Sequence, residues 1–400
     1  MMEKNMNELM VRGEKVIMGT YKRFPVVLVK GSGCRVWDSN GKEYLDMVAG
    51  IAVCSLGHCH PKVTEAIKRQ LDILIHVSNL YYIEPQIRLG EILTKNSFAD
   101  KVFFCNSGAE ANEAAIKLAR RYSFNKYGEN RYEIITMLNS FHGRTLATLA
   151  ATGQKKFREG FEPLPPGFSQ VPYDDLSALE KAITNRTCAV MLEPIQGEGG
   201  VIIPHEDYLK GVRKICDKYN ILLIFDEVQT GMGRTGTLWA YEQSGIEPDI
   251  LTVAKALGSG FPIGALLAKE EVAEAFSPGS HASTFGGNPL AASAALATLE
   301  ILMEEKIIDN CKEQGAYLLE KLRELKSRFP SLIKDVRGKG LIAALELTVD
   351  GDDIVHHCLE KGLLINCTNT NILRFIPPLV ITKREIEDAC SILVEVLTEK

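Results

Sequence analysis

The sequence predicts an α/β protein with a three-layer large domain around a mostly parallel sheet, followed by a smaller α+β domain. Through most of the chain before residue 290, short continuous apolar runs alternate with segments whose apolar residues recur at helical spacing. Continuous apolar runs are typical of strands buried on both faces, and their alternation with helices favours a parallel sheet between helical layers. Beyond residue 290 a long helical pattern is followed by strands and a closing helix.

The elements of the large domain follow in order. Residues 102–104 form a predicted strand that leads into a helix over about 109–122. Further elements are predicted as strands at 133–137, 189–192, 221–225 and 249–253, with a helix over 207–219. Ligands of such sheets bind at the carboxyl ends of the strands, so the side chains that follow these runs are the candidates for function.

The remainder of the chain has a different pattern. A helical pattern starts at Pro289 and runs past Leu325, strand candidates follow at 341–347 and 372–375, and a helix begins at about Lys383. The predicted division is an N-terminal segment that joins the small domain (1–60), a large domain (61–290) and a C-terminal small domain (291–400).

The composition is that of a soluble globular protein. Hydrophobic residues are 46% and charged residues 24% of the chain, which argues against disorder. The net charge of −5 gives no reason to expect nucleic acid or an anionic membrane as a partner. No run reaches the roughly 18 apolar residues of a membrane span, and the start MMEKNMNELM lacks the apolar core of a signal peptide. Ten cysteines without paired spacing favour reduced thiols and a cytoplasmic location.

The stretch FFCNSGAEANEAAIK predicts a strand, a tight turn and a helix. Ser107 and Glu110 form an S-x-x-E capping box at the helix start. Gly108 would let backbone N–H groups approach a ligand, and a helix N-terminus favours an anion. An ordinary capped helix is the alternative interpretation of this stretch.

Charged side chains end two of the most apolar strands. Asp226 and Glu227 follow the run ILLIF, and Lys255 follows DILTVA. A buried carboxylate needs a cation or a strong donor, and a partly desolvated lysine amine can act as a nucleophile or form a Schiff base. An anchored phosphate, an aspartate and a lysine together indicate pyridoxal phosphate, which needs a Schiff-base amine and a partner for its pyridinium nitrogen.

Four further side chains are candidates for the site. SFHGRT contains Phe141, which can cover a flat ring, and Arg144, which can bind a carboxylate with two hydrogen bonds. Glu198 stands in the Gly-rich EPIQGEGG, and Arg374 stands in the strand-like LRFIPP, where it needs a partner. Taken singly, Phe141 fits a core position and Arg144 a surface ion pair.

A cluster of possible metal ligands lies in VCSLGHCHP, with Cys54, His58, Cys59 and His60. The spacing matches no closed zinc pattern, and no second pair of ligands accompanies it. Gly57 and Pro61 fit a turn before a helix, which explains the segment better, so we predict no metal site.

These segments together resemble the class III, fold-type I aminotransferases that use pyridoxal phosphate. The runs that carry the resemblance cover nearly the whole chain and stand in the order of the family: SGAEANEAAIKLAR, SFHGRT, LEPIQGEGG, FDEVQTGMGRTG, AKALGSGFPIGA and STFGGNPL. Several long motifs in order are far more specific than any one of them. The resemblance implies a fold-type I transferase and a homodimer with shared active sites.

The resemblance also implies how the cofactor is held. Ser107, Gly108 and Ala109 would bind its phosphate. Phe141 would stack on its ring, with Val228 packed against the opposite face.

The reacting groups are implied in the same way. Asp226 would keep the pyridine nitrogen protonated, and Gln229 would bond to the ring hydroxyl. Lys255 would carry the cofactor and then act as general acid and base. Thr284 would reach the phosphate in the neighbouring subunit, and Ser283 would lie near the substrate.

Substrate specificity is implied by two arginines. Arg144 would bind the far carboxylate of either substrate, and Arg374 the α-carboxylate of glutamate or 2-oxoglutarate. A terminal-amine donor has no carboxylate near its reacting carbon, so Glu198 would neutralise Arg374 in that half-reaction. YKRFP and SNLYY resemble the branch of arginine biosynthesis that acts on N2-acetyl-L-ornithine. Ornithine, succinylornithine, succinyl-diaminopimelate and 4-aminobutyrate remain alternative donors.

The distant alternative is a nicotinamide oxidoreductase. GMGRTG (231–236) matches the dinucleotide pattern G-x-G-x-x-G, which requires a helix that opens from the glycines and an acidic residue about 20 positions on. The acidic residues Glu247 and Asp249 come too early, and five residues separate the strand from the first glycine. The sequence offers no physical reason for Arg234 in this loop.

Overall fold

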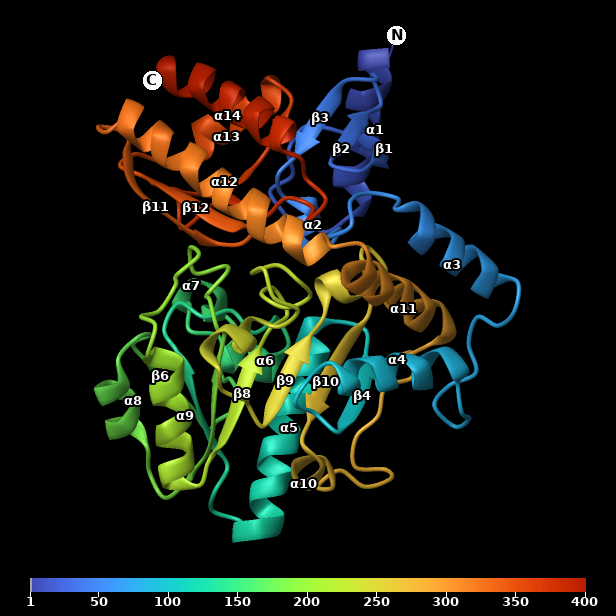
Figure 1. Ribbon diagram of the computed structural model, residues 1–400, viewed down its shortest axis with the longest axis vertical. Helices are drawn as coiled ribbons and strands as arrows, with labels where there is room; N and C mark the ends of the chain where they lie inside the picture. The colour runs from blue at the N-terminus through green and yellow to red at the C-terminus, as the bar shows by residue number, and fades with distance from the viewer. Residues whose placement is uncertain (1) are drawn as a thin grey trace.

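A seven-stranded sheet forms the centre of the larger part of the molecule (Figure 1). The computed structural model describes residues 2–400, and within them the strands form three sheets. The central sheet has the order β4-β10-β9-β8-β7-β5-β6. Its strands are β4 (Lys101–Cys105), β5 (Glu133–Met137), β6 (Phe168–Val171), β7 (Thr187–Leu192), β8 (Leu222–Asp226), β9 (Ile250–Val253) and β10 (Gly264–Ala268). Strands β6, β5, β7, β8 and β9 are parallel and β10 is antiparallel to its neighbours, which confirms the predicted mostly parallel sheet.

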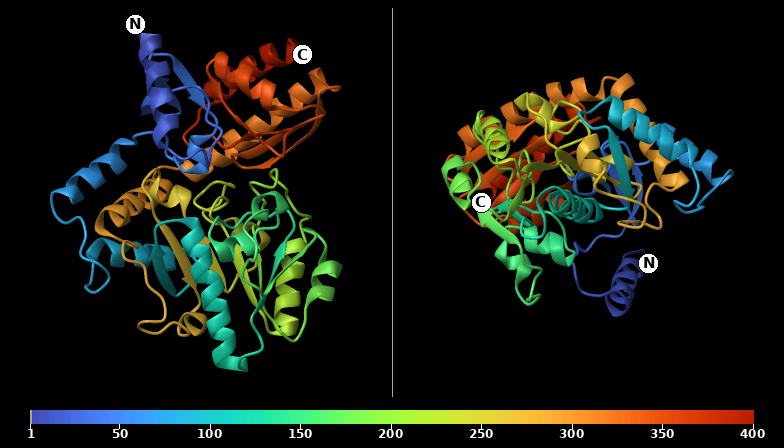
Figure 2. Two further views of the ribbon diagram at one scale, coloured as in Figure 1. Left: turned by 180° about the vertical axis from the view of Figure 1, so that it is seen from behind. Right: turned by 90° about the horizontal axis from the view of Figure 1, so that it is seen from below.

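The sheet separates two apolar layers because successive strand residues point to opposite faces. Leu222 and Ile224 of β8 pack in the cluster that contains α5 (Gly108–Tyr127), which lies across the sheet in Figure 2, left. Leu223 and Phe225 belong to the cluster that contains α9 (Tyr208–Tyr219) and α11 (Pro289–Glu304). The other helical segments of this part are α6 (Leu146–Ala151), α7 (Lys155–Arg158), α8 (Leu176–Ala182), α10 (Glu270–Ala273), η1 (Ala240–Ser244) and η2 (Lys255–Gly258).

The N-terminal segment and the C-terminal part lie together at one end of the molecule (Figure 1). β13 (Leu363–Leu364) pairs in parallel with β3 (Glu43–Asp46) and completes a sheet with β1 (Leu28–Ser32) and β2 (Arg35–Asp38). The third sheet is antiparallel and has the order β11 (Ile333–Lys339), β12 (Ile342–Leu347), β15 (Ile372–Phe375), β14 (Asn366–Thr368). The helices of these regions are α1 (Met2–Val16), α2 (Ala49–Ala52), α12 (Ile307–Arg328), α13 (Asp352–Glu360) and α14 (Lys383–Thr398). Helices α3 (Pro61–Leu71) and α4 (Glu84–Lys95) follow the N-terminal segment and pack against α11 of the larger part. The domain boundaries stay predictions.

The helical pattern after Pro289 forms two helices rather than one. Lys306 has φ +57 and ends the run between α11 and α12. Helix α11 packs against α3 and α4, whereas α12 packs against β11 and α14. Each of the two helices buries an apolar face, although against a different part of the fold. The apolar residues therefore recur without interruption, and the sequence pattern does not reveal the break.

Candidate active site

A cavity of about 400 Å³ opens at the carboxyl ends of β7, β8 and β9. Ten of the predicted site residues line it: Ser107, Gly108, Ala109, Phe141, Arg144, Glu198, Asp226, Val228, Gln229 and Lys255. The parallel sheet explains this gathering, because residues that follow neighbouring strands meet at one edge.

The N-terminus of α5 forms one wall of the cavity. Ser107 Oγ accepts a hydrogen bond from the Glu110 backbone N (3.2 Å), and Glu110 Oε2 accepts one from the Asn106 backbone N (2.6 Å). A Cβ at Gly108 would come within 2.7 Å of Val228 Cγ1, so only glycine fits here. Ser107 therefore caps the helix as predicted, but the reciprocal half of the capping box is not formed, because Glu110 bonds to the backbone N of Asn106 and not to that of Ser107. The first turn of α5 offers its N–H groups to an anion.

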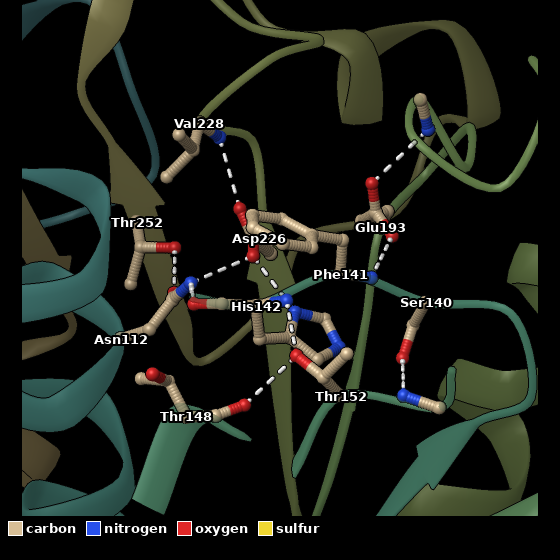
Figure 3. Close-up of polar contacts among 12 residues, drawn as sticks. Asn112, Ser140, Phe141, His142, Thr148, Thr152, Glu193, Asp226, Val228 and Thr252 are labelled. Carbon is tan, nitrogen blue, oxygen red and sulfur yellow. Dashed lines mark hydrogen bonds and ion pairs between the residues drawn. The ribbon is translucent and has the colours of Figure 1, made fainter. Parts of the chain in front are cut away.

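Asp226 is held in a buried polar network (Figure 3). Its Oδ2 accepts a hydrogen bond from Asn112 Nδ2 (2.7 Å) and lies 2.7 Å from His142 Nδ1, and its Oδ1 accepts one from the Val228 backbone N (3.0 Å). Thr252 Oγ1 in turn donates to Asn112 Oδ1 (2.6 Å). These contacts fix both oxygens of the carboxylate and offset the free energy that it costs to remove this charge from water.

The supporting residues of this network were not predicted as site residues. His142 lies inside the quoted SFHGRT and Asn112 inside the quoted helix, but neither position has a local pattern that marks it. The second buried carboxylate, Glu193, could have been found, since it follows the apolar strand β7 as Asp226 ends β8.

Glu193 fixes the backbone beside the cavity. Its two carboxylate oxygens accept hydrogen bonds from the backbone N of Phe141 (3.0 Å) and of Gly197 (3.1 Å). Burial, together with the charge of Asp226, raises the pKa of Glu193 to about 7 against the opposing effect of His142. Glu193 thereby sets the position of Phe141 and of the loop that carries Glu198.

Lys255 begins η2, with one residue between it and the end of β9, and has φ +45, in the left-handed region that residues other than glycine rarely adopt. Such strain persists only where the surrounding structure enforces it, and it is concentrated at functional sites. Within residues 2–400 the Lys255 amine has no hydrogen-bond or ion-pair partner. Burial lowers the pKa of this amine, although Glu198 opposes the shift. The amine is therefore a candidate nucleophile.

Arg374 and Glu198 form a direct ion pair. Arg374 Nη1 donates to Glu198 Oε1 (2.6 Å), and Gln229 contacts both partners at 3.3 Å and 3.4 Å. Burial alone would raise the pKa of Glu198, but the charges of Arg374 and Lys255, together with the hydrogen bonds from Arg374 and Gln229, outweigh burial and lower it. Arg374 is fully buried and reaches the cavity only through Glu198 and Gln229. An incoming carboxylate could bind Arg374 only after Glu198 moves away.

Besides Arg374, two predicted residues, Ser283 and Thr284, lie apart from the cavity wall of this chain. Ser283 Oγ accepts a hydrogen bond from Asn106 Nδ2 (3.3 Å), and Asn106 itself lines the cavity. Thr284 is exposed and contributes nothing to the cavity lining. The predicted contact of Thr284 with a neighbouring subunit stays a prediction.

The loop with the dinucleotide pattern does not have the structure that a dinucleotide requires. In the described chain no α-helix opens from residues 231–236, and turns continue to η1. The alternative of a nicotinamide site is therefore wrong. Arg234 instead is fully buried and crosses to the C-terminal part, where Nη1 donates to the carbonyls of Leu341 (2.9 Å) and Pro377 (2.5 Å). Its Nη2 donates to Ser55 Oγ (3.2 Å) in the N-terminal segment.

In the segment from Cys54 to His60, the imidazole of His58 pairs with the carboxylate of Asp46. His58 Nε2 lies 2.7 Å from Asp46 Oδ2, an interaction that contributes most to raising the pKa of His58 to about 10. The described part of the chain contains no group of three or more histidine, cysteine or acidic side chains that could hold a metal ion. It also contains no helix long and apolar enough to cross a membrane.

Known proteins resemble the chain over nearly its full length. The acetylornithine aminotransferase of Methanocaldococcus jannaschii is 56% identical over 386 residues, which are 96% of this chain and 97% of the relative. That of Caldanaerobacter subterraneus is 55% identical, over 96% of this chain and 98% of the relative.

Solved structures agree with the sequence comparison. The ornithine aminotransferase of Toxoplasma gondii has a TM-score of 0.95 at 37% identity and covers 98% of this chain and 95% of its own; another structure of that enzyme has partial occupancy of PLP at the active site. The acetylornithine aminotransferase of Elizabethkingia anophelis has a TM-score of 0.88 at 36% identity, over 99% of both chains. The aminotransferase class-III family pattern matches residues 17–397. With its cavity at the strand ends and this similarity along its length, the chain belongs to the class-III aminotransferase family.

Proposed function

We propose that this aminotransferase moves the terminal amino group of N2-acetyl-L-ornithine to 2-oxoglutarate, with pyridoxal 5'-phosphate as cofactor. The products are N-acetyl-L-glutamate 5-semialdehyde and L-glutamate, which places the reaction in arginine biosynthesis. The observation that supports the proposal best is the direct ion pair of Arg374 and Glu198, with Nη1 and Oε1 2.6 Å apart. It lies beside the Lys255 amine, which has no hydrogen-bond or ion-pair partner in residues 2–400. A site that accepts two kinds of donor needs such an arginine, available in one half-reaction and neutralised in the other.

The cavity fits pyridoxal phosphate on the chemistry of its walls. The N–H groups at the start of α5 suit a phosphate, and Gly108 leaves the room that a Cβ would fill. Asp226 presents a fixed carboxylate to the same space, which suits a protonated ring nitrogen. When bound, the cofactor supplies a carbonyl carbon that takes up the amino group and a ring that withdraws electrons from the reacting carbon.

The roles of the chain's own residues follow from these positions. Asp226, held by Asn112 and His142, keeps the ring nitrogen protonated through a charge-assisted hydrogen bond. Phe141 and Val228 hold the ring between them, and both line the cavity. The remaining proposed cofactor contacts are Ser107, Gly108 and Ala109 to the phosphate and Gln229 to the ring hydroxyl.

Lys255 moves the proton. Its lowered pKa leaves a larger neutral fraction of the amine near neutral pH than an exposed lysine has. A neutral amine can attach the cofactor, accept a proton from the substrate carbon and return it to the neighbouring carbon as general base and then acid.

The two arginines orient the substrates. Arg144 binds the carboxylate of acetylornithine and the distal carboxylate of 2-oxoglutarate, with Ser283 nearby. Arg374 binds the α-carboxylate of 2-oxoglutarate or glutamate after Glu198 leaves. During the acetylornithine half-reaction Glu198 stays on Arg374, so that no buried cation faces the donor's uncharged carbon chain.

We also propose that the enzyme is a cytoplasmic homodimer in which Thr284 completes the phosphate site of the neighbouring subunit. Leu80, Tyr81 and Tyr82 are 83%, 68% and 97% exposed, and apolar groups of this size are commonly covered by a partner. Asn79 Nδ2 donates to the Ser283 carbonyl (3.0 Å), so this exposed segment lies beside Thr284. We expect no nucleic acid, membrane or metal as a partner.

A donor panel tests the proposal. Purified holoenzyme is offered acetylornithine, ornithine, succinylornithine, succinyl-diaminopimelate and 4-aminobutyrate, each with 2-oxoglutarate, and kcat/KM is compared. The largest value is expected for acetylornithine, and a larger value for another donor would replace it as the substrate. Borohydride reduction and peptide mapping test the cofactor, because label on any residue except Lys255 would contradict the mechanism.

A further inference from the structure

Arg144 is held in the cavity wall by an aromatic ring. Its guanidinium carbon lies 3.9 Å from the centroid of Phe157 in α7 and 5.6 Å from that of Phe141. The two rings meet edge to face, with centroids 5.7 Å apart and planes at 84°. A guanidinium at stacking distance over a ring gains a cation–π attraction that requires no hydrogen bond.

This contact leaves the hydrogen-bonding capacity of Arg144 free. Arg144 has no hydrogen bond and no ion pair with any of residues 2–400. Glu113, an acidic side chain of α5, is engaged instead by Thr145 Oγ1 (2.5 Å), which belongs to the residue after Arg144. Because stacking uses the face of the guanidinium, the N–H groups in its plane remain available to a carboxylate.

The two arginines of the site are thus held by opposite means. Arg374 is held by the carboxylate of Glu198, which a substrate carboxylate must displace. Arg144 is held by Phe157, which competes with no carboxylate. This difference matches the reaction, since the distal carboxylate must be bound in both half-reactions and the α-carboxylate in only one.

We propose that Phe157 is a specificity-determining residue, which positions Arg144 for the distal carboxylate of both substrates. The inference rests on the proposed function for the role of Arg144. Lys156 lies over the same ring, with its Nζ 5.0 Å from the centroid, and donates to Asn369 Oδ1 (3.3 Å). The ring of Phe157 therefore has two positive charges beside it, those of Arg144 and Lys156.

The test compares acceptors that differ only beyond the reacting end. The acceptor 2-oxoglutarate has a distal carboxylate, and pyruvate has none. In Phe157→Leu we expect KM to rise about five- to tenfold with 2-oxoglutarate as acceptor and kcat to stay within about twofold, while kcat/KM with pyruvate is unchanged. Phe157→Tyr, which keeps the ring, should restore wild-type values. Phe161→Leu is the matched control, because Phe161 is an exposed phenylalanine of the same segment.

An equilibrium measurement accompanies the kinetics. Calorimetry of glutarate and butyrate with the holoenzyme should show a Kd for glutarate raised about five- to tenfold in Phe157→Leu and a Kd for butyrate that does not change. Phe157→Met serves as a second variant if Phe157→Leu does not fold, with the same expected result.

The outcomes separate this inference from the proposed function. Equal losses for 2-oxoglutarate and pyruvate would mean that Phe157 acts through packing on Phe141, and no change for either would mean that the ring does not position Arg144; both overturn the inference. If acetylornithine proves not to be the donor, the same comparison with glutamate and alanine as donors still tests Phe157. A selective loss for glutamate would then support the inference while the donor assignment fails.

Discussion

Arg374 and Glu198, 176 residues apart in the chain, lie with Nη1 and Oε1 2.6 Å apart, and Glu198 lines the cavity. The guanidinium is buried, with side-chain exposure of 1%, whereas the carboxylate retains 24%. The partner that is free to move is therefore Glu198, which stands in a loop, and the fixed partner is Arg374, which stands in β15. This asymmetry supports the proposal that Glu198, and not Arg374, moves when a substrate carboxylate binds.

Replacing Glu198 by Gln should shift specificity toward donors with an α-carboxylate. The glutamine no longer neutralises Arg374, so the ratio of kcat/KM for glutamate to that for acetylornithine should rise about tenfold. Stopped-flow measurement of each half-reaction checks this. Glu159→Gln, at an exposed glutamate outside the cavity lining, should leave the ratio unchanged. An unchanged ratio in Glu198→Gln would show that this carboxylate is not the switch.

Lys255→Ala should abolish transamination and leave cofactor binding in place. The variant loses the amine that moves the proton, but it keeps the α5 N-terminus and Asp226. Turnover and the absorbance of bound pyridoxal phosphate, measured on the same sample, check both halves of the statement. Turnover comparable to that of the wild type would place the base elsewhere.

Asp226→Asn should reduce kcat by about 10²-fold, because the charge-assisted hydrogen bond to the ring nitrogen is lost. The amide keeps the size of the side chain, so the fold should persist, and circular dichroism serves as the check on folding. A kcat within about threefold of the wild type would mean that the charge at this position does not assist the reaction.

Glu227 should make stability depend on pH. It is fully buried, where its oxygens accept hydrogen bonds from the backbone N of Ala240 and Tyr241. Burial raises its pKa from 4.5 to about 8. The unfolded chain therefore releases this proton first, so the contribution of Glu227 to stability is present below about pH 4.5 and is lost as pH rises toward about 8.

Urea unfolding of the wild type and of Glu227→Gln across this range measures the effect. The free energy of unfolding should fall less steeply with pH in the variant, by on the order of a few kcal/mol over the whole range. Parallel pH profiles would contradict the assignment, whatever the absolute stability of the variant.

Arg234→Met should destabilise the protein by about 2–4 kcal/mol, because the buried carbonyls of Leu341 and Pro377 lose their donor. This loss of stability should appear as a shorter half-life of activity at a fixed elevated temperature. Arg121→Met is the control, since Arg121 is exposed and stacks only on Phe124 among the contacts of the described chain. Equal half-lives for the two variants would show that Arg234 does not tie the parts of the molecule together.

Local sequence determined the elements and the reactive groups. The alternation of apolar runs and helical patterns predicted the parallel sheet, and β5 and β15 lie where the patterns placed them. Asp226 and Lys255 were identifiable because a charge at the end of an apolar strand is costly unless it has a partner or a function. The Ser107 cap was identifiable because the S-x-x-E pattern is read within four residues, whereas the bond of Glu110 to Asn106 in place of Ser107 was not predicted.

Contacts between distant segments were decided only by the tertiary structure. Asn112, His142 and Asp226 belong to three different segments, and no local pattern states that they meet. Arg234 reaches carbonyls 107 and 143 residues away, and that distance is why its role could not be read from the loop that contains it. The physical reason is common to these cases: periodicity and caps act over a few residues, whereas a buried polar group takes whichever partner the packing of distant elements supplies.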